Sequence, residues 1–521
     1  MPDPAEPYTI VPAPRVGRRS TTDARPNRWH VLDAADVADR SSPAVAYASH
    51  SLLISTLVEE DDPMEVLSQA ADVFGWQVAI DPDYAIDVEE SADRTQDRAR
   101  RVPRATGPLS IRRVIISADP TQSVNEPDGW KLLQRARAIR GERGLRSVGL
   151  DHGIRLTPPG LRWPVSVSAA AADSPSSSYM YAGSGGREPV RYVGPAPEYG
   201  PTSSRTTRRP VVGLLDSGCG DHPWLTNVRR HVLDPLGQPI GHDDAASDSE
   251  SSADLFGPLD GKADEISGHG TFMAGIVRQS CPSADIVSWR LSGSEGTVSE
   301  SDLLLALSQI ADLLEHSASA GTKVALDVLV LALGYYHEDL SELSQGHLLS
   351  EVLLRIRRAG TTVVCAAGND STDVPFLPAA LCRWNVGPSL VAQAEPDDAA
   401  PLLSVGALNP NDTVALFSNS GPWVTCYAPG ASVLSTTPAT NAGAQPTSRV
   451  TAYGLQRETI DSDDSTSGFA IWSGTSFAAP YVAGWILRTL EPELPAPDSP
   501  EQAADIATAW RVVSELTGLE P

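Results

Sequence analysis

The stretch VVGLLDSGCGDHPWL (211–225) combines a short apolar segment with polar and glycine residues that follow it directly. Its first part, VVGLL (211–215), has no polar side chain, which is typical of a strand buried on both faces of a sheet. Apolar segments of the same kind recur at 284–291, 324–333 and 361–367. Helical patterns lie between them, at 302–316 and 341–360. This alternation predicts an α/β fold, a parallel sheet covered by helices on both faces.

Four regions follow from composition and periodicity. Residues 1–48 show no sustained period and predict a flexible arm. Residues 49–160 contain the order strand, helix, strand twice, which predicts a small α+β domain of the ferredoxin-like type. Residues 161–209 are rich in Ser, Pro and Gly and predict a linker. The α/β unit then occupies residues 210–521.

Bulk properties exclude several classes of partner. The net charge of −26 over 521 residues argues against nucleic acid and against anionic membranes, which both need a basic surface. No apolar run approaches the roughly 20 residues of a membrane helix, and the first residues lack the apolar core of a signal peptide. The five cysteines are widely spaced and odd in number. We therefore expect reduced thiols and a cytoplasmic protein.

Three polar residues stand where chemistry is expected in such a sheet, beyond the carboxyl ends of the strands. Asp216 follows VVGLL directly, and a carboxylate there can hold an imidazole in one tautomer. His269 lies between glycines in GHGTFMAG (268–275) and can exchange a proton near neutral pH. Ser476 lies in SGTSFAAPYVAG (473–484), at the start of a predicted helix whose N–H groups favour negative charge.

Together these segments resemble the subtilase family of serine peptidases over roughly residues 210–495. The order Asp216, His269, Ser476 is the subtilisin order. The resemblance implies that these residues form a catalytic triad and that the chain is a serine endopeptidase acting on proteins or peptides. A fourth segment, VVCAAGND (363–370), is similar to the family's strand ending in AAGN. Asn369 would thus donate to the oxyanion, together with the backbone N–H of Ser476.

The resemblance extends to the substrate groove. The segment LALG (331–334) resembles an edge that usually reads SLG, so Ala332, Leu333 and Gly334 would pair with an extended substrate. A wall of the pocket would come from Ala366, Ala367 and Gly368. Phe272 stands where many relatives have a second histidine, which leaves the catalytic histidine unaffected.

Many subtilases carry a ferredoxin-like propeptide, so residues 49–160 are expected to act on the chain itself as inhibitor or chaperone. A permanently retained regulatory module is the alternative. The chemistry requires no cofactor and no metal. Calcium is conceivable at the acidic stretches 242–254 and 436–470, but neither has a recognisable ligand spacing, and both are interpreted as solvated loops.

Two other functions remain open at this point. A catalytically silent scaffold would retain the fold without the reaction, although such proteins normally lose a triad or oxyanion residue. Hydrolysis of small esters or amides is disfavoured by the peptide-like edge at 331–334.

Overall fold

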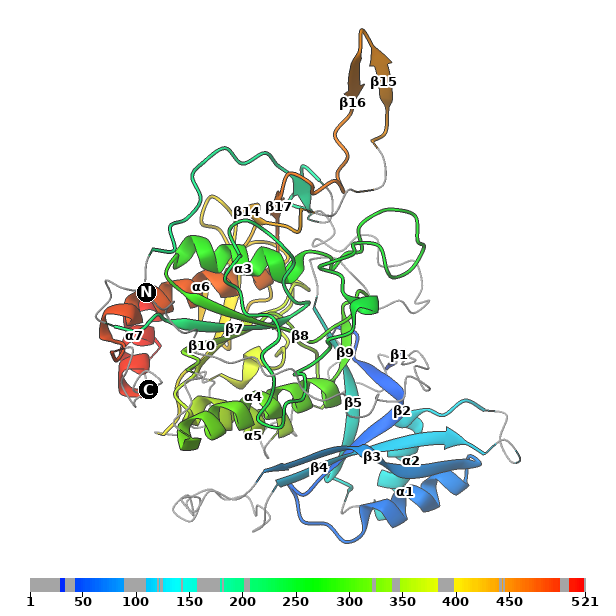
Figure 1. Ribbon diagram of the computed structural model, residues 1–521. Coiled ribbons are helices and arrows are strands. Elements are labelled where there is room, and N and C mark those ends of the chain that lie inside the picture. Colours follow the sequence, from blue (N-terminus) through cyan, green and yellow to red (C-terminus); the bar gives the residue numbers. More distant parts are fainter. Residues whose placement is uncertain are drawn as a thin grey trace.

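The computed structural model describes residues 29–32, 43–88, 109–119, 125–141, 144–156, 182–200, 207–320, 325–339, 347–382, 398–439, 446–496 and 506–519, with single residues at 121, 179 and 443. The chain forms two units, which the strand β5 (Val148–Arg155) connects (Figure 1). Most of the predicted arm lies outside the described residues, whereas 179, 182–200 and 207–209 of the predicted linker are described. In the described part of the chain, no helix is both long and apolar enough to cross a bilayer.

The larger unit is built on a sheet of six parallel strands in the order β13-β12-β11-β10-β7-β8. Their bounds are β7 Val211–Asp216, β8 Asp285–Arg290, β10 Val328–Leu331, β11 Thr362–Ala366, β12 Leu402–Leu408 and β13 Cys426–Pro429. Every residue of β7 is buried, as the apolar sequence predicts. Its side chains alternate between two cores, with Val211 and Leu215 in one and Val212 and Leu214 in the other.

Helices lie on both sides of this sheet (Figure 1). On one side α3 (His269–Ser280) packs beside α6 (Thr475–Leu490), and α7 (Ile506–Thr517) contacts α6. On the other side α4 (Glu300–Ala320) packs beside α5 (Leu348–Arg358). The helix predicted at 302–316 is confirmed, and the apolar residues spaced along one of its faces are buried: Leu303, Leu307, Ile310, Ala311 and Leu314.

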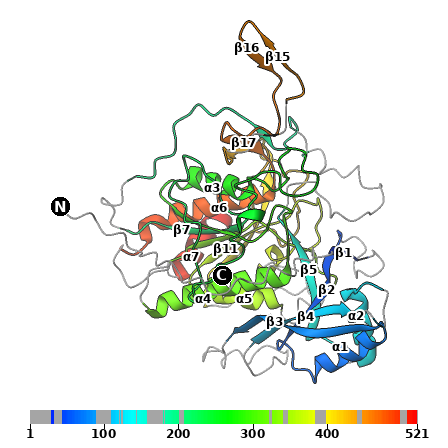
Figure 2. The same ribbon diagram turned by 45° about the vertical axis from the view of Figure 1, so that its right-hand side comes forward.

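Smaller elements complete the unit. A three-stranded antiparallel sheet joins β14 (Val433–Thr436), β17 (Phe469–Trp472) and β6 (Glu188–Pro189). The hairpin of β15 (Arg449–Ala452) and β16 (Leu455–Glu458) projects from the body in both views (Figures 1 and 2). Short 3-10 turns occur at Ala245–Ser247, Ala379–Leu381 and Glu491–Glu493. The expected linker is thus partly ordered, since its residues 188 and 189 pair with β17.

The smaller unit is an antiparallel sheet with two helices. Its elements follow the order β2 (Ala46–Ser55), α1 (Pro63–Asp72), β3 (Trp76–Val88), β4 (Leu109–Ala118), α2 (Gly129–Arg140) and β5 (Val148–Arg155). The strand order is β3-β4-β2-β5, and β1 (Trp29–Val31) pairs with β2. Asp62 and Asp128 cap the two helices through hydrogen bonds to backbone N–H groups.

The strand β5 connects the two units. Its first half pairs with β2, whereas Gly153, Ile154 and Arg155 pair with β9 (Thr297–Ser299) of the larger unit. Figure 2 shows β5 rising from the small sheet into the large body. The sequence predicted a final strand in the smaller unit but not its second partner.

Close packing of α3 against α6 depends on Gly484. A Cβ atom added there would lie 2.5 Å from the Cβ of Ser280. We expect Gly484→Ala to lower the free energy of unfolding of the larger unit by about 1–3 kcal/mol, because the helices must separate. Gly293→Ala is the control, since its Cβ would meet its nearest neighbour at an ordinary 3.4 Å. Chemical denaturation of both variants measures the difference, and equal stability would refute the packing argument.

Candidate active site

Asp216 and His269 form a buried pair at the carboxyl end of β7. The Nδ1 atom of His269 lies 2.7 Å from Oδ1 of Asp216. The backbone N–H of Ser217 donates to the same oxygen over 2.8 Å. Both side chains of the pair have no exposed surface. A carboxylate so placed fixes the ring with its Nδ1–H toward Asp216 and its Nε2 on the opposite side.

The loops that carry this pair approach each other more closely than any side chain would allow. His269 is the first residue of α3, and Gly268 precedes it with φ 83°, a conformation that favours glycine. A Cβ on Gly270 would lie 2.0 Å from the carbonyl oxygen of Gly218. The glycines on both sides of the histidine are therefore a geometric requirement of the site.

Aromatic rings bring α6 to the histidine. The ring of His269 lies 5.3 Å from that of Phe477 and 5.7 Å from that of Trp472, between centroids. Phe477 directly follows Ser476, which is the second residue of α6 and is 2% exposed. Among the described residues, His269 Nε2 has no hydrogen-bond partner. The structure thus gathers the three predicted residues at one end of the sheet.

Asn369 follows β11 and faces the start of the same helix. Its Oδ1 accepts hydrogen bonds from the backbone N–H and the hydroxyl of Thr475, both over 2.9 Å. This fixes the orientation of the amide, with its oxygen toward Thr475 and its NH2 group on the other side. The backbone N–H of Ser476 belongs to the first turn of α6, where N–H groups have no partner within the helix.

A second asparagine braces this segment. Asn419 donates through Nδ2 to the carbonyl of Ala367, and its Oδ1 accepts a hydrogen bond from the backbone N–H of Asp370. Its own backbone N–H donates to the carbonyl of Gly368. The predicted pocket wall of Ala366, Ala367 and Gly368 is therefore buried and rigidly held.

The expected substrate edge is occupied by the chain itself. Arg155 and Gly334 exchange two backbone hydrogen bonds, of 3.1 and 3.2 Å, and the N–H of Leu156 donates to the carbonyl of Gly296. The end of β5 thus lies between β9 and the segment that contains Ala332, Leu333 and Gly334. An extended peptide fills the place where the sequence predicted one.

Glu250 is a functional candidate that the sequence interpretation missed. It lies in the acidic stretch 242–254, which was interpreted as a solvated loop, yet it is only 2% exposed. Burial raises the pKa of Glu250 to about 7, and the nearby charge of Asp216 acts in the same direction. No signal in the sequence separates this glutamate from the exposed acidic residues beside it.

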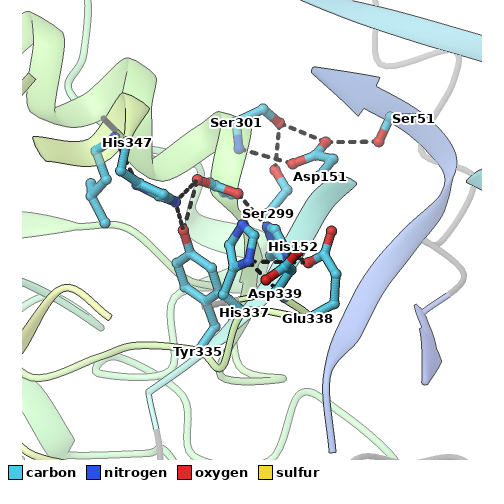
Figure 3. A network of polar contacts seen from close by, with 12 residues as sticks. Ser51, Asp151, His152, Ser299, Ser301, Tyr335, His337, Glu338, Asp339 and His347 are labelled. Carbon is cyan, nitrogen blue, oxygen red and sulfur yellow. Dashed lines mark hydrogen bonds and ion pairs between the residues drawn. The ribbon is translucent and has the colours of Figure 1, made fainter. Parts of the chain in front are cut away.

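A charged cluster joins the two units beside the groove (Figure 3). His152 of β5 lies between two carboxylates of the larger unit, with Nδ1 2.6 Å from Glu300 and Nε2 2.7 Å from Glu338. All three side chains are 3% exposed. Next to them, the Asp151 carboxylate accepts hydrogen bonds from Ser51 and from the backbone and hydroxyl of Ser301.

The charges of this cluster stabilise one another. Burial alone would lower the pKa of His152, but the charges of Glu338 and Glu300 raise it to about 10. Burial alone would raise the pKa of Glu300, but the charge of His152 lowers it to about 2. Burial alone would likewise raise the pKa of Glu338, but the charges of His337 and His152 hold it far below its usual value. The group is therefore a buried carboxylate–imidazolium–carboxylate triplet.

The described acidic groups that could hold a metal ion have protein partners in this structure. His152, His337 and Glu338 bring ligand atoms within 4.8 Å of one another. The 2.7 Å between His152 Nε2 and Glu338 Oε2 is a hydrogen-bond distance, shorter than the roughly 3.3 Å between two ligand atoms of a tetrahedral zinc ion, so these two atoms bind each other in this structure. In the acidic stretch 242–254, Asp244 accepts from Ser247 and Asp254 accepts from the N–H of Gly261.

Comparison with known proteins identifies the family. The family model described as the subtilase family matches residues 207–510. The chain belongs to the subtilase family. The match begins three residues before the predicted start of the α/β unit at 210 and includes the segments of Asp216, His269, Asn369 and Ser476.

Two proteases are named among the relatives. A subtilisin-like protease of Coccidioides posadasii is 28% identical over 221 residues, which are 42% of this chain and 42% of that protein. A cuticle-degrading serine protease of Arthrobotrys oligospora is 26% identical over 294 residues, 55% of this chain and 57% of that protein. The matched part therefore spans about half the length of these relatives. A solved lanthipeptide protease is 18% identical, with a TM-score of 0.36, and covers 58% of this chain and 86% of its own.

Proposed function

We propose that the chain is a serine endopeptidase in which Asp216, His269 and Ser476 form the catalytic triad. The observation that carries this proposal is the buried 2.7 Å contact between Asp216 and His269, with the helix of Ser476 packed against the same imidazole. Membership of the subtilase family supports it. The substrates are proteins or peptides.

Each residue has a defined part in the proposed reaction. Ser476 attacks the peptide carbonyl while His269 Nε2 takes its proton, and Asp216 stabilises the imidazolium that results. The NH2 group of Asn369 and the N–H of Ser476 donate to the oxyanion. His269 then protonates the leaving amine, and water repeats the sequence to release the acyl group from Ser476.

These steps need no cofactor and no metal, because protein groups supply the nucleophile, the base and the oxyanion donors. Any structural calcium stays unassigned. None of the five cysteines, which all lie in the described part of the chain, forms a disulfide, and four of them are buried. Reduced thiols support the proposal of a reducing, cytoplasmic environment.

We also propose that residues 49–160 are a ferredoxin-like domain that inhibits the active site. The order β-α-β-β-α-β and the antiparallel sheet support the first part. The second part rests on β5, whose end pairs with β9 and Gly334 in the way expected of substrate. Burial lowers the pKa of Arg155 to about 10, and the charges of Asp370 and Glu265 partly offset this effect and favour its cationic form.

A fluorophosphonate probe tests the enzymatic proposal. We expect the wild-type chain to be labelled at Ser476, because only an activated serine reacts, and Ser476→Ala to remain unlabelled. Peptide mapping of the labelled protein identifies the site. Failure of the wild type to react, even after removal of residues 1–160, would favour the alternative of a silent scaffold with the subtilase fold.

The orientation of Asn369 gives a second prediction. Thr475→Val removes the hydroxyl that donates to Asn369 Oδ1 but keeps the backbone donor. We expect kcat for a peptide substrate to fall about tenfold with KM almost unchanged, because the oxyanion donor acts only in the transition state. Thr489→Val, at the exposed end of α6, is the control. A change in KM alone would contradict the role of Asn369.

The charged cluster makes the docking of the small domain dependent on pH. The groups that face His152 are Glu300 at the start of α4, Glu338 after β10, and the rings of Tyr335, His337 and His347. Because the pKa of His152 is raised from 6.5 to about 10, its stabilisation is complete below pH 6.5 and is lost as the pH rises toward 10. The carboxylates contribute above about pH 4.5, since their pKa values are lowered.

We therefore expect inhibition to weaken as the pH rises from 6.5 to 10. His152→Gln removes the central charge and leaves two buried carboxylates unbalanced, at a cost of about 3–5 kcal/mol. The rate of labelling at Ser476 should be higher in this variant and should lack the additional rise above pH 8 that we expect of the wild type. His231→Gln, an exposed histidine, and a chelator are the controls. Equal rates of labelling at Ser476 in the wild type and in His152→Gln would show that the charged cluster does not hold the small domain on the active site.

A further inference from the structure

Glu250 lies behind the Asp216–His269 pair and binds both loops that carry it. Its Oε1 accepts from the hydroxyl of Ser217 over 2.6 Å and from the N–H of Gly270 over 3.1 Å. Its Oε2 accepts from the hydroxyl of Thr271 over 2.5 Å. Each donor comes from the residues that directly follow Asp216 or His269 in the chain.

The hydroxyl of Ser217 connects the two carboxylates. It lies 2.6 Å from Glu250 Oε1 and 3.1 Å from Asp216 Oδ1, and it accepts the N–H of Gly270 over 2.9 Å. A hydroxyl has one proton to donate. When Glu250 is charged, the Ser217 hydroxyl therefore donates to Glu250 Oε1, which is the nearer of the two carboxylate oxygens. When Glu250 is protonated, its own O–H can donate to Ser217, whose proton then turns to Asp216.

Thr271 also donates a hydrogen bond to Glu250, at the second carboxylate oxygen, Oε2. Its Oγ1 accepts the backbone N–H of Gly220 over 2.7 Å, which leaves its proton for Glu250. Every described hydrogen bond at the Glu250 carboxylate is thus donated to it, the arrangement that suits a charged group. A second negative charge then stands one hydroxyl away from Asp216, at a site that is shielded from water.

We propose that Glu250 is a positioning residue of the catalytic site, which holds the loops of Asp216 and His269 together and whose charge favours the imidazolium form of His269. This rests on the proposed peptidase function and deepens it. In the reaction the imidazolium forms as Ser476 loses its proton, so a neighbouring negative charge stabilises the transition state. Burial raises the pKa of Glu250 to about 7, so this charge is removed below neutral pH.

The test is the pH dependence of Glu250→Gln, which keeps the shape of the side chain and removes its charge. The rate of fluorophosphonate labelling at Ser476 should fall about three- to tenfold above pH 8. The midpoint of its acidic limb should move down by about 0.5–1 pH unit, because the imidazolium loses a stabilising charge. Glu250→Asp, which keeps the charge, should retain the midpoint nearest to that of the wild type.

A role limited to stability would lower the unfolding midpoint without moving the acidic limb. The matched control is Asp327→Asn, a buried carboxylate at the opposite end of β7, where it accepts the N–H of Val211 and pairs with Arg208. It should lose stability and keep the pH profile. An unchanged acidic midpoint in folded Glu250→Gln overturns the proposal.

Two measurements keep the outcome decisive. If Glu250→Gln does not fold, Thr271→Val removes one donor from the carboxylate, favours its protonation and should lower the midpoint in the same direction. The His269 Nδ1 proton, followed by NMR in the full chain with labelled histidine, reports the same ionisation without any reaction at Ser476. If the wild type shows the His269 titration by NMR but is never labelled at Ser476, the peptidase function is refuted. The effect of Glu250 on His269 is then still tested by the NMR titration alone.

Discussion

The site depends on a carboxylate that has no access to water. Asp216 ends a strand whose residues are all buried, and an unpaired charge there would cost several kcal/mol. The imidazole of His269 and the N–H of Ser217 compensate this cost, and both must come within hydrogen-bond distance. Gly270 allows the approach, since any side chain there would collide with the carbonyl of Gly218. The Asp216–His269 pair therefore requires glycine on both sides of the histidine, at 268 and 270.

The same principle operates at the contact between the two units. His152 enters a buried region that already contains the carboxylates of Glu300 and Glu338, and each charge is tolerated only because the others are present. Backbone pairing of β5 with β9 and Gly334 supplies the remaining contacts. A domain held by backbone pairing and by a titratable triplet can be stable and still be released by a change in conditions.

Much of the fold could be predicted because buried parallel strands and amphipathic helices leave strong local patterns. The apolar run at 211–215 and the buried face of α4 are examples. The residues Asp216, His269, Asn369 and Ser476 were accessible because each lies in a distinctive short segment. Glu250 was not, since its burial depends on donors from Ser217 and Thr271 that are distant in sequence. The second partner of β5 was equally hidden, because pairing between units leaves no periodicity within either one.

The central claim is that Ser476, activated through His269 and Asp216, forms a covalent acyl intermediate. Mass spectrometry of the chain, quenched in acid during reaction with an activated peptide ester and measured both intact and after digestion, tests this directly. The account predicts a mass increase of one acyl group on the peptide that contains Ser476, and none in His269→Ala. Turnover of the ester without any acylated serine, or acylation at another residue, would contradict it.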